Sequence, residues 1–185
     1  MKQHIDDPTT LLLEDTAVDG AARLILRAAM RQNDGTCARK TLVPAIMNEE
    51  SFNLAASRAV EKGYLIPILG SDRLSVGEPP KETIMWFFNW MSEEGGCECL
   101  TSLATEYYSE LTLRLLQVVS PLNEWDIIEM LGAPHELGEK AIENAHEHPN
   151  IKAEEVEEDE FELYGRQSAW LELRHFQDGF MEEHE

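Results

Sequence analysis

The sequence predicts a mainly α-helical protein with one small β-hairpin, in which a small N-terminal unit precedes an acidic helical bundle. Apolar residues recur at helical spacing through most of the 185-residue chain. Residues 64–76 instead combine two short β-prone runs with a turn at Gly70-Ser71-Asp72. Charge divides the halves: residues 1–80 hold nine Lys and Arg against eleven Asp and Glu, whereas residues 81–185 hold six against twenty-five.

The N-terminal elements follow from local signals. Residues 1–15 are predicted to form a loose arm, and a helix starts at Thr16 and closes near Gly35. A short second helix is expected over residues 41–48, with Pro44 in its first turn. A third helix covers residues 52–62, with Ser51 as N-cap and Gly63 as its stop.

The third helix, the closing Gly63-Tyr64-Leu65 and the hairpin around Gly70-Ser71-Asp72 together resemble a winged helix-turn-helix domain over residues 16–78. In that superfamily the third helix commonly reads the DNA major groove, and the wing touches the backbone. The resemblance therefore implies DNA binding. The outward face of this helix carries little positive charge, which favours a docking module instead; its residues are Asn53, Leu54, Ser57, Arg58 and Glu61.

The basic residues of this half are candidates for an anion contact. Arg23, Arg27 and Arg31 recur at i, i+4 and i+8 along the first helix. Arg39, Lys40, Arg58 and Arg73 complete the candidate set. Three interpretations stay open: a solvated helix face, a contact to nucleic-acid phosphates, or an intramolecular contact to the acidic half.

Gly77-Glu78-Pro79-Pro80 predicts the boundary between the N-terminal unit, residues 16–78, and an acidic helical domain, residues 81–185. The next helix, residues 81–94, is apolar nearly all round and is predicted to be buried on most sides, where it packs the two halves together. The alternative is that part of it forms a homodimer contact. Further helices are expected over residues 101–119, 122–131, 135–146 and 166–182, with Trp125, Ile128 and Leu131 of the second facing inward.

Residues 153–162 form an acidic segment that interrupts these helices. Its acids are Glu154, Glu155, Glu157, Glu158, Asp159, Glu160 and Glu162. The segment is either a solvated loop or a strip that binds a partner, and Val156 and Phe161 within it favour the second interpretation.

Catalytic signatures are not found in the sequence: there is no phosphate-binding loop, dinucleotide fingerprint, zinc-protease motif or nucleophile elbow. We therefore expect no catalytic residues, cofactor or metal. Cys97, Cys99, His146 and His148 could supply metal ligands only by long-range closure, and free thiols are the simpler expectation. The three cysteines and the lack of a secretory leader or membrane span predict a cytoplasmic protein.

The formal charge of −21 favours basic partners. We expect a non-enzymatic regulatory interaction protein whose acidic half binds a basic surface on a nucleic-acid-binding protein or complex. In composition the chain resembles DNA-mimic inhibitors of phage or plasmid origin. The alternative is a dimeric winged-helix DNA-binding transcription regulator, and an enzyme is the third possibility.

Overall fold

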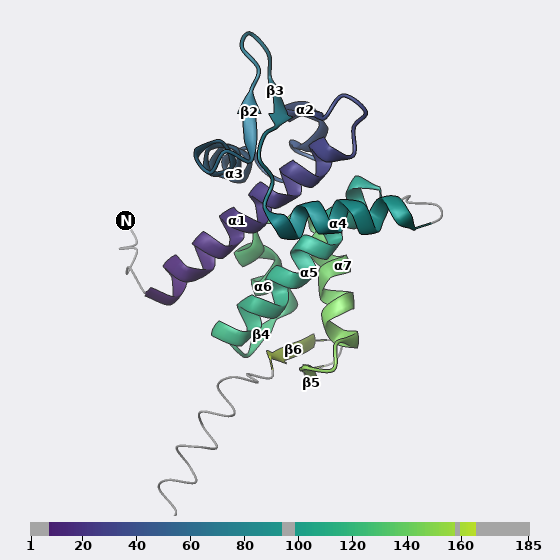
Figure 1. The fold of residues 1–185 in the computed structure, drawn as a ribbon. Coiled ribbons are helices and arrows are strands. Elements are labelled where there is room, and N and C mark those ends of the chain that lie inside the picture. Colours follow the sequence, from purple (N-terminus) through teal and green to yellow (C-terminus); the bar gives the residue numbers. More distant parts are fainter. Residues whose placement is uncertain (1–7, 94–98, 158–159, 166–185) are drawn as a thin grey trace, which may run out of the picture.

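The computed structural model describes residues 8–93, 99–157 and 160–165. In this part of the chain, helices and two three-stranded antiparallel sheets form an N-terminal unit and a second, mainly helical half (Figure 1). The elements are α1 (Pro8–Met30), β1 (Thr36–Ala38), α2 (Arg39–Leu42), α3 (Glu49–Glu61), β2 (Leu65–Pro67), β3 (Arg73–Val76), α4 (Lys81–Ser92), α5 (Leu100–Val118), β4 (Leu122–Asn123), α6 (Glu124–Leu131), α7 (His135–Glu147), β5 (Ile151–Glu157) and β6 (Glu160–Gly165). No helix in the described ranges has the length and apolar character that a bilayer span needs.

The first helix is longer than predicted. Helix α1 begins at Pro8 rather than at Thr16. Proline is well suited to a first helical turn, because its missing N–H would have no intrahelical partner there. The prediction of a loose arm is therefore wrong from residue 8 onward.

The predicted hairpin is confirmed and gains a third strand. β2 and β3 pair antiparallel, with Leu65 opposite Val76, and β1 adds to the other edge of β3, with Ala38 opposite Arg73. The sequence did not predict β1, because a buried three-residue strand gives no periodic signal. The elements of this unit follow in the order α1-β1-α2-α3-β2-β3.

The connection between α1 and α3 differs from the prediction. The second helix covers only Arg39–Leu42 rather than residues 41–48, and the chain turns around Pro44. The N-cap of α3 is Asn48, whose side-chain oxygen accepts a 2.8 Å hydrogen bond from the Ser51 amide. The predicted cap at Ser51 is wrong, because Glu49 and Glu50 already occupy the first turn, where acidic side chains are favoured.

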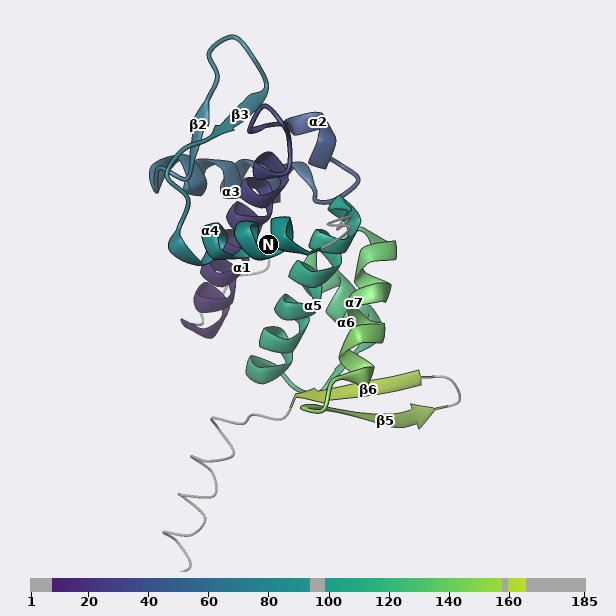
Figure 2. The same cartoon turned by 45° about the vertical axis from the view of Figure 1, so that its right-hand side comes forward.

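Helix α4 lies across α1 and is not buried as predicted (Figure 2). Thr83 is its only buried residue within the described part of the chain. Its Trp86 packs against the core on the α1 side, but Ile84, Met85, Phe88 and Met91 are exposed. The prediction that α4 is buried on most sides by packing the two halves together is therefore wrong for this second face.

The described residues of the acidic segment, 153–157 and 160–162, lie in strands. They belong to the β5–β6 hairpin, to which β4 adds at the other edge of β6. This sheet lies across the ends of α5 and α7 (Figure 2). Leu163 of β6 is fully buried against Leu115 and Leu116 of α5, which explains why the segment forms a strand. The prediction that residues 81–185 form a purely helical bundle is therefore wrong where this sheet covers the ends of α5 and α7.

Two further predictions concern the same half. Trp125 is exposed rather than inward, and Ile127 is the buried residue of α6. The helix predicted over residues 166–182 lies outside the described residues.

The larger hydrophobic core joins both halves of the chain. Ile25 and Leu26 of α1 share it with Phe52 of α3, Leu103 of α5 and Leu137 of α7. Two tyrosine hydroxyls add polar links: Tyr107 donates to the Ala17 carbonyl at 3.0 Å, and Tyr108 donates to the Ile46 carbonyl at 2.9 Å. A Cβ at Gly20 would lie 2.7 Å from the Tyr107 ring, so glycine permits the close approach of α1 to α5.

We predict that Leu26→Ala lowers the free energy of unfolding by about 2–5 kcal/mol, because the fully buried side chain would leave a cavity in the shared core. Urea denaturation followed by circular dichroism measures the change. Leu54→Ala on the exposed side of α3 is the control, with an effect within about 0.5 kcal/mol. Equal losses in the two variants would contradict this description of the core.

Candidate interaction surfaces

The arginines of α1 are engaged by the second half of the chain. The guanidinium carbon of Arg27 lies 4.8 Å from the Trp86 ring centroid, and that of Arg31 lies 5.7 Å from the Trp90 ring centroid. The two indoles stack at 5.9 Å with only 7° between their planes. Cations over aromatic faces attract electrostatically, more strongly where water is excluded. This arrangement attaches α4 to α1.

Arg27 also reaches α5, where its Nη1 donates to Glu106 Oε1 at 3.5 Å. Three nitrogen atoms are buried without a hydrogen-bond partner among the described residues: Nε of Arg27, Nε of Arg31 and the indole Nε1 of Trp90. Arg23 alone of the three is exposed, and it has no ion-pair partner among the described residues. Two of the three α1 arginines singled out from the sequence, Arg27 and Arg31, are therefore engaged in contacts within the fold.

The cations of α3 are neutralised by acids of α1. Arg58 contacts Asp15 and Asp19, each at 3.0 Å, and Lys62 contacts Asp19 at 3.0 Å. Burial by itself raises the pKa of Asp19, but the hydrogen bond and charge of Lys62, together with Arg58, outweigh burial. The pKa of Asp19 is therefore lower than its ordinary value.

The remaining cations of the candidate set follow the same pattern, with one exception. Arg39 pairs with Glu49, and Arg73 pairs with Asp34 at 3.0 Å. Arg73 also donates from Nε to the Thr36 hydroxyl at 2.9 Å. Lys40 is exposed and has no ion-pair partner in the described part of the chain.

Several apolar side chains are exposed on α3 and the hairpin. Leu54 and Val60 of α3 are exposed, as are Ile66 and Ile68 of the hairpin. Leu69 at the hairpin tip is 98% exposed, and the hairpin projects away from the rest of the molecule (Figure 1). A surface of this kind suits contact with protein better than contact with phosphates.

The structure reveals an acidic stripe on α7, which we define as Glu136, Glu139, Glu143 and Glu147. All four are exposed and recur at i, i+3, i+7 and i+11, on one side of the helix. Glu136 pairs with Lys140 at 3.4 Å, and Nδ1 of His135 lies 3.4 Å from Oε1 of Glu139. Glu143 and Glu147 have no partner among the described residues. The helical spacing of these four glutamates is visible in the sequence. It was not used as a prediction, because the acids of segment 153–162 are more closely spaced.

The acidic segment itself is only partly available. Glu154 pairs with Lys152, whereas Glu155 is exposed and has no partner in the described ranges. The strand register places Glu154 directly opposite Glu162, and Glu157 opposite Glu160. Like charges at facing positions of neighbouring strands destabilise a sheet. The two other predicted acids, Glu158 and Asp159, lie outside the described residues.

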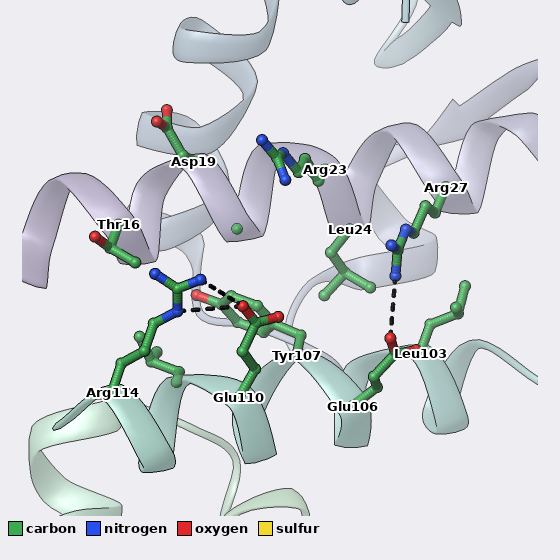
Figure 3. A pocket seen from close by; sticks show the side chains of 12 residues that line it. Thr16, Asp19, Arg23, Leu24, Arg27, Leu103, Glu106, Tyr107, Glu110 and Arg114 are labelled. Carbon is green, nitrogen blue, oxygen red and sulfur yellow. Dashed lines mark hydrogen bonds and ion pairs between the residues drawn. The ribbon is translucent and has the colours of Figure 1, made fainter. Parts of the chain in front are cut away.

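A pocket of about 240 Å³ lies between α1 and α5 (Figure 3). Its charged lining is balanced, because three arginines meet three acids; these are Asp19, Arg23, Arg27, Glu106, Glu110 and Arg114. Arg114 is bound to Glu110 at 2.7 Å, and Arg27 to Glu106. With its charges mostly paired, the pocket shows no preference for a charged ligand.

The cysteine and histidine set does not come together as a metal site in the described residues. Nε2 of His146 lies 2.9 Å from Glu124, and Nδ1 of His148 accepts from the Asn150 amide at 3.2 Å. Cys99 is exposed beside Ser102, whose hydrogen bond lowers the pKa of the thiol. Cys97 lies outside the described residues.

No protein-family model matches the chain, and neither curated proteins nor solved structures contain a significant match.

We predict that Arg27→Gln and Arg31→Gln each lower the free energy of unfolding by about 1 kcal/mol, because each removes a cation from an indole face. Arg23→Gln is the matched control on the same helix and should change it by less than about 0.5 kcal/mol. Thermal and urea denaturation measure all three. A loss as large for Arg23→Gln as for the other two would show that the stacking contributes nothing.

A second prediction concerns pH. Because the pKa of Asp19 is lower in the folded chain, its stabilisation is present above the unfolded value of about 3.9. It is lost as the pH falls through the lower folded value. Asp19→Asn should therefore destabilise the protein near pH 7, and the difference from wild type should shrink from about pH 5 toward pH 2.

Urea titrations across this pH range measure the difference. Asp72→Asn is the control, because the exposed side chain of Asp72 has no partner among the described residues. A destabilisation by Asp19→Asn that does not change with pH would exclude the ion pairs as its cause.

Proposed function

We propose that this is a cytoplasmic, non-enzymatic interaction protein whose acidic half binds a basic surface on a nucleic-acid-binding protein or complex. The observation that carries the proposal is the exposed acidic stripe on α7, in which Glu143 and Glu147 have no partner among the described residues. Most cations of the N-terminal unit, by contrast, are paired within the fold.

The spacing of the acidic stripe supports this partner class. Glu136 and Glu147 are eleven residues apart, which corresponds to about 16 Å of helix at 1.5 Å per residue. Four carboxylates over that length, one of them paired with Lys140, lie roughly 5 Å apart along the helix axis, against one phosphate per about 3.4 Å of helix axis on each DNA strand. A protein surface that binds DNA phosphates would therefore meet a similar row of negative charges on α7. DNA-mimic inhibitors bind such surfaces in the same way.

The β5–β6 hairpin extends the acidic surface. The strand register places Glu154 opposite Glu162, and Glu155 is exposed without a partner among the described residues. A cationic partner that reaches α7 would also meet this carboxylate.

The N-terminal unit supports a second candidate function. Its order α1-β1-α2-α3-β2-β3 is what we would expect of a winged helix, which makes a DNA-binding transcription regulator the alternative. Arg58 and Lys62 on α3 are already paired with acids, and Leu54 and Leu69 are exposed. We therefore propose that this unit docks onto protein rather than reads DNA.

The test uses two variants with the same change in net charge. One replaces Glu139, Glu143 and Glu147 of the acidic stripe by glutamine. The control replaces Glu50 and Glu61 by glutamine and Asp72 by asparagine, all exposed acids of the N-terminal unit. Tagged proteins are used to capture partners from the native host, and duplex DNA is used to elute them.

We expect wild type and control to retain a nucleic-acid-binding protein that DNA displaces, and the stripe variant to lose it by roughly tenfold or more. Equal losses in both variants would mean that only net charge matters. Direct binding of labelled duplex DNA by the purified protein, with affinity that falls steeply with salt, would instead favour the regulator.

A further inference from the structure

Trp125 of α6 carries a large aromatic surface that the described chain leaves 72% exposed. The other two tryptophans of the described ranges, Trp86 and Trp90, each lie under an arginine of α1. No cation of the described residues lies over the Trp125 ring. An indole is the aromatic ring that attracts cations most strongly. Trp125 is therefore the described indole that has no cation bound to it.

Carboxylates lie next to Trp125 on both α6 and α7. Glu129 follows it by one turn of α6 on the same side, and is exposed without an ion-pair partner among the described residues. On α7, the His135 ring centroid lies 5.7 Å from that of the indole, and Nδ1 of His135 lies 3.4 Å from Glu139 of the acidic stripe. The two rings meet at 66°, so His135 does not stack flat on the indole.

The fold already holds one arginine between an indole and a carboxylate. The guanidinium carbon of Arg27 lies 4.8 Å from the Trp86 ring centroid, and Nη1 of Arg27 donates to Glu106 at 3.5 Å. A planar guanidinium can stack on an indole through its face while its N–H groups donate to carboxylates, whereas the ammonium of lysine is a compact, strongly hydrated point charge. The surface at Trp125 offers the same indole and carboxylates without the arginine.

We propose that Trp125 anchors the partner at the acidic surface by binding one of its arginines, whose guanidinium stacks on the indole and donates to the neighbouring Glu129 and Glu139. This inference rests on the proposed function, since the partner is the same basic protein, and it adds that the partner presents arginine here. Tryptophan and arginine are enriched among the residues that dominate binding energy. A tryptophan also has few rotatable bonds, so fixing it in an interface costs little entropy.

Charge argues that this arginine comes from another protein. The ranges outside the described residues, 1–7, 94–98, 158–159 and 166–185, each hold more Asp and Glu than Lys and Arg. A segment with net negative charge is repelled by Glu129 and the acidic stripe, whereas a basic protein surface is attracted to both. Charge complementarity therefore selects the basic partner as the occupant.

Two peptides of equal charge test the choice of arginine: hexaarginine and hexalysine, each labelled with fluorescein and titrated with the full-length protein while anisotropy is recorded. Trp125→Leu should weaken hexaarginine binding about fivefold and hexalysine binding by less than about twofold, because only arginine stacks and donates together. Phe88→Leu is the control: it removes an exposed aromatic ring from α4 and should leave both affinities unchanged. An unchanged preference for hexaarginine in Trp125→Leu overturns the inference, as do equal losses for both peptides.

A separate variant tests the proposed function itself. Replacing Glu143 and Glu147 together by glutamine removes two unpaired charges of the acidic stripe and should weaken both peptides by a similar factor, about threefold. If this double variant leaves both affinities unchanged, the acidic stripe is not the binding surface and the proposed function fails. If it weakens both and Trp125→Leu has no selective effect, only the role of Trp125 fails.

The indole Nε1–H resonance of Trp125, identified by its loss in Trp125→Leu, reports the occupant directly. Hexaarginine should shift this resonance in the wild-type protein. Replacing Arg166 and Arg174 together by glutamine should leave it in place in the free protein. A shift in that variant as large as the one caused by hexaarginine overturns the inference, because an arginine of the chain itself would then occupy the indole.

Discussion

The packing of helix α1 between the two halves is the constraint on which the rest of this structure depends. Its apolar side enters the core shared by α3, α5 and α7, and Gly20 lets it approach Tyr107. Its acidic positions near the start, Asp15 and Asp19, bind the cations of α3. Its later positions, Arg27 and Arg31, hold the tryptophans of α4. One helix therefore sets the position of both halves.

This arrangement also determines where charge is left at the surface. Pairing with Asp15, Asp19, Asp34 and Glu49 removes most of the positive potential that the N-terminal unit could offer. The second half has few cations to pair with its many acids, so its negative potential reaches solvent along α7 and the β5–β6 hairpin. The uneven division of charge along the sequence therefore becomes, in the folded protein, one acidic end and one nearly neutral, partly apolar end.

Local signals in the sequence predicted most helices and the β2–β3 hairpin, but not the environments of their side chains. Periodicity marks which residues are apolar, and it does not say which neighbour covers them. That is why Trp125 and the outer residues of α4, such as Phe88 and Met91, were expected to be inward. The Arg27 and Arg31 contacts depend on the crossing of α1 and α4, which no local pattern contains. Strand β6 was not predicted because glutamates precede its buried residue, Leu163, and hide the strand pattern.

The acidic stripe on α7 sets the electrostatic character of the partner that this end of the molecule can bind. Binding of a cationic partner to the acidic stripe gains from charge attraction, so added salt weakens it. The formal charge of −21 repels another acidic surface, so this end of the molecule selects a partner of opposite charge.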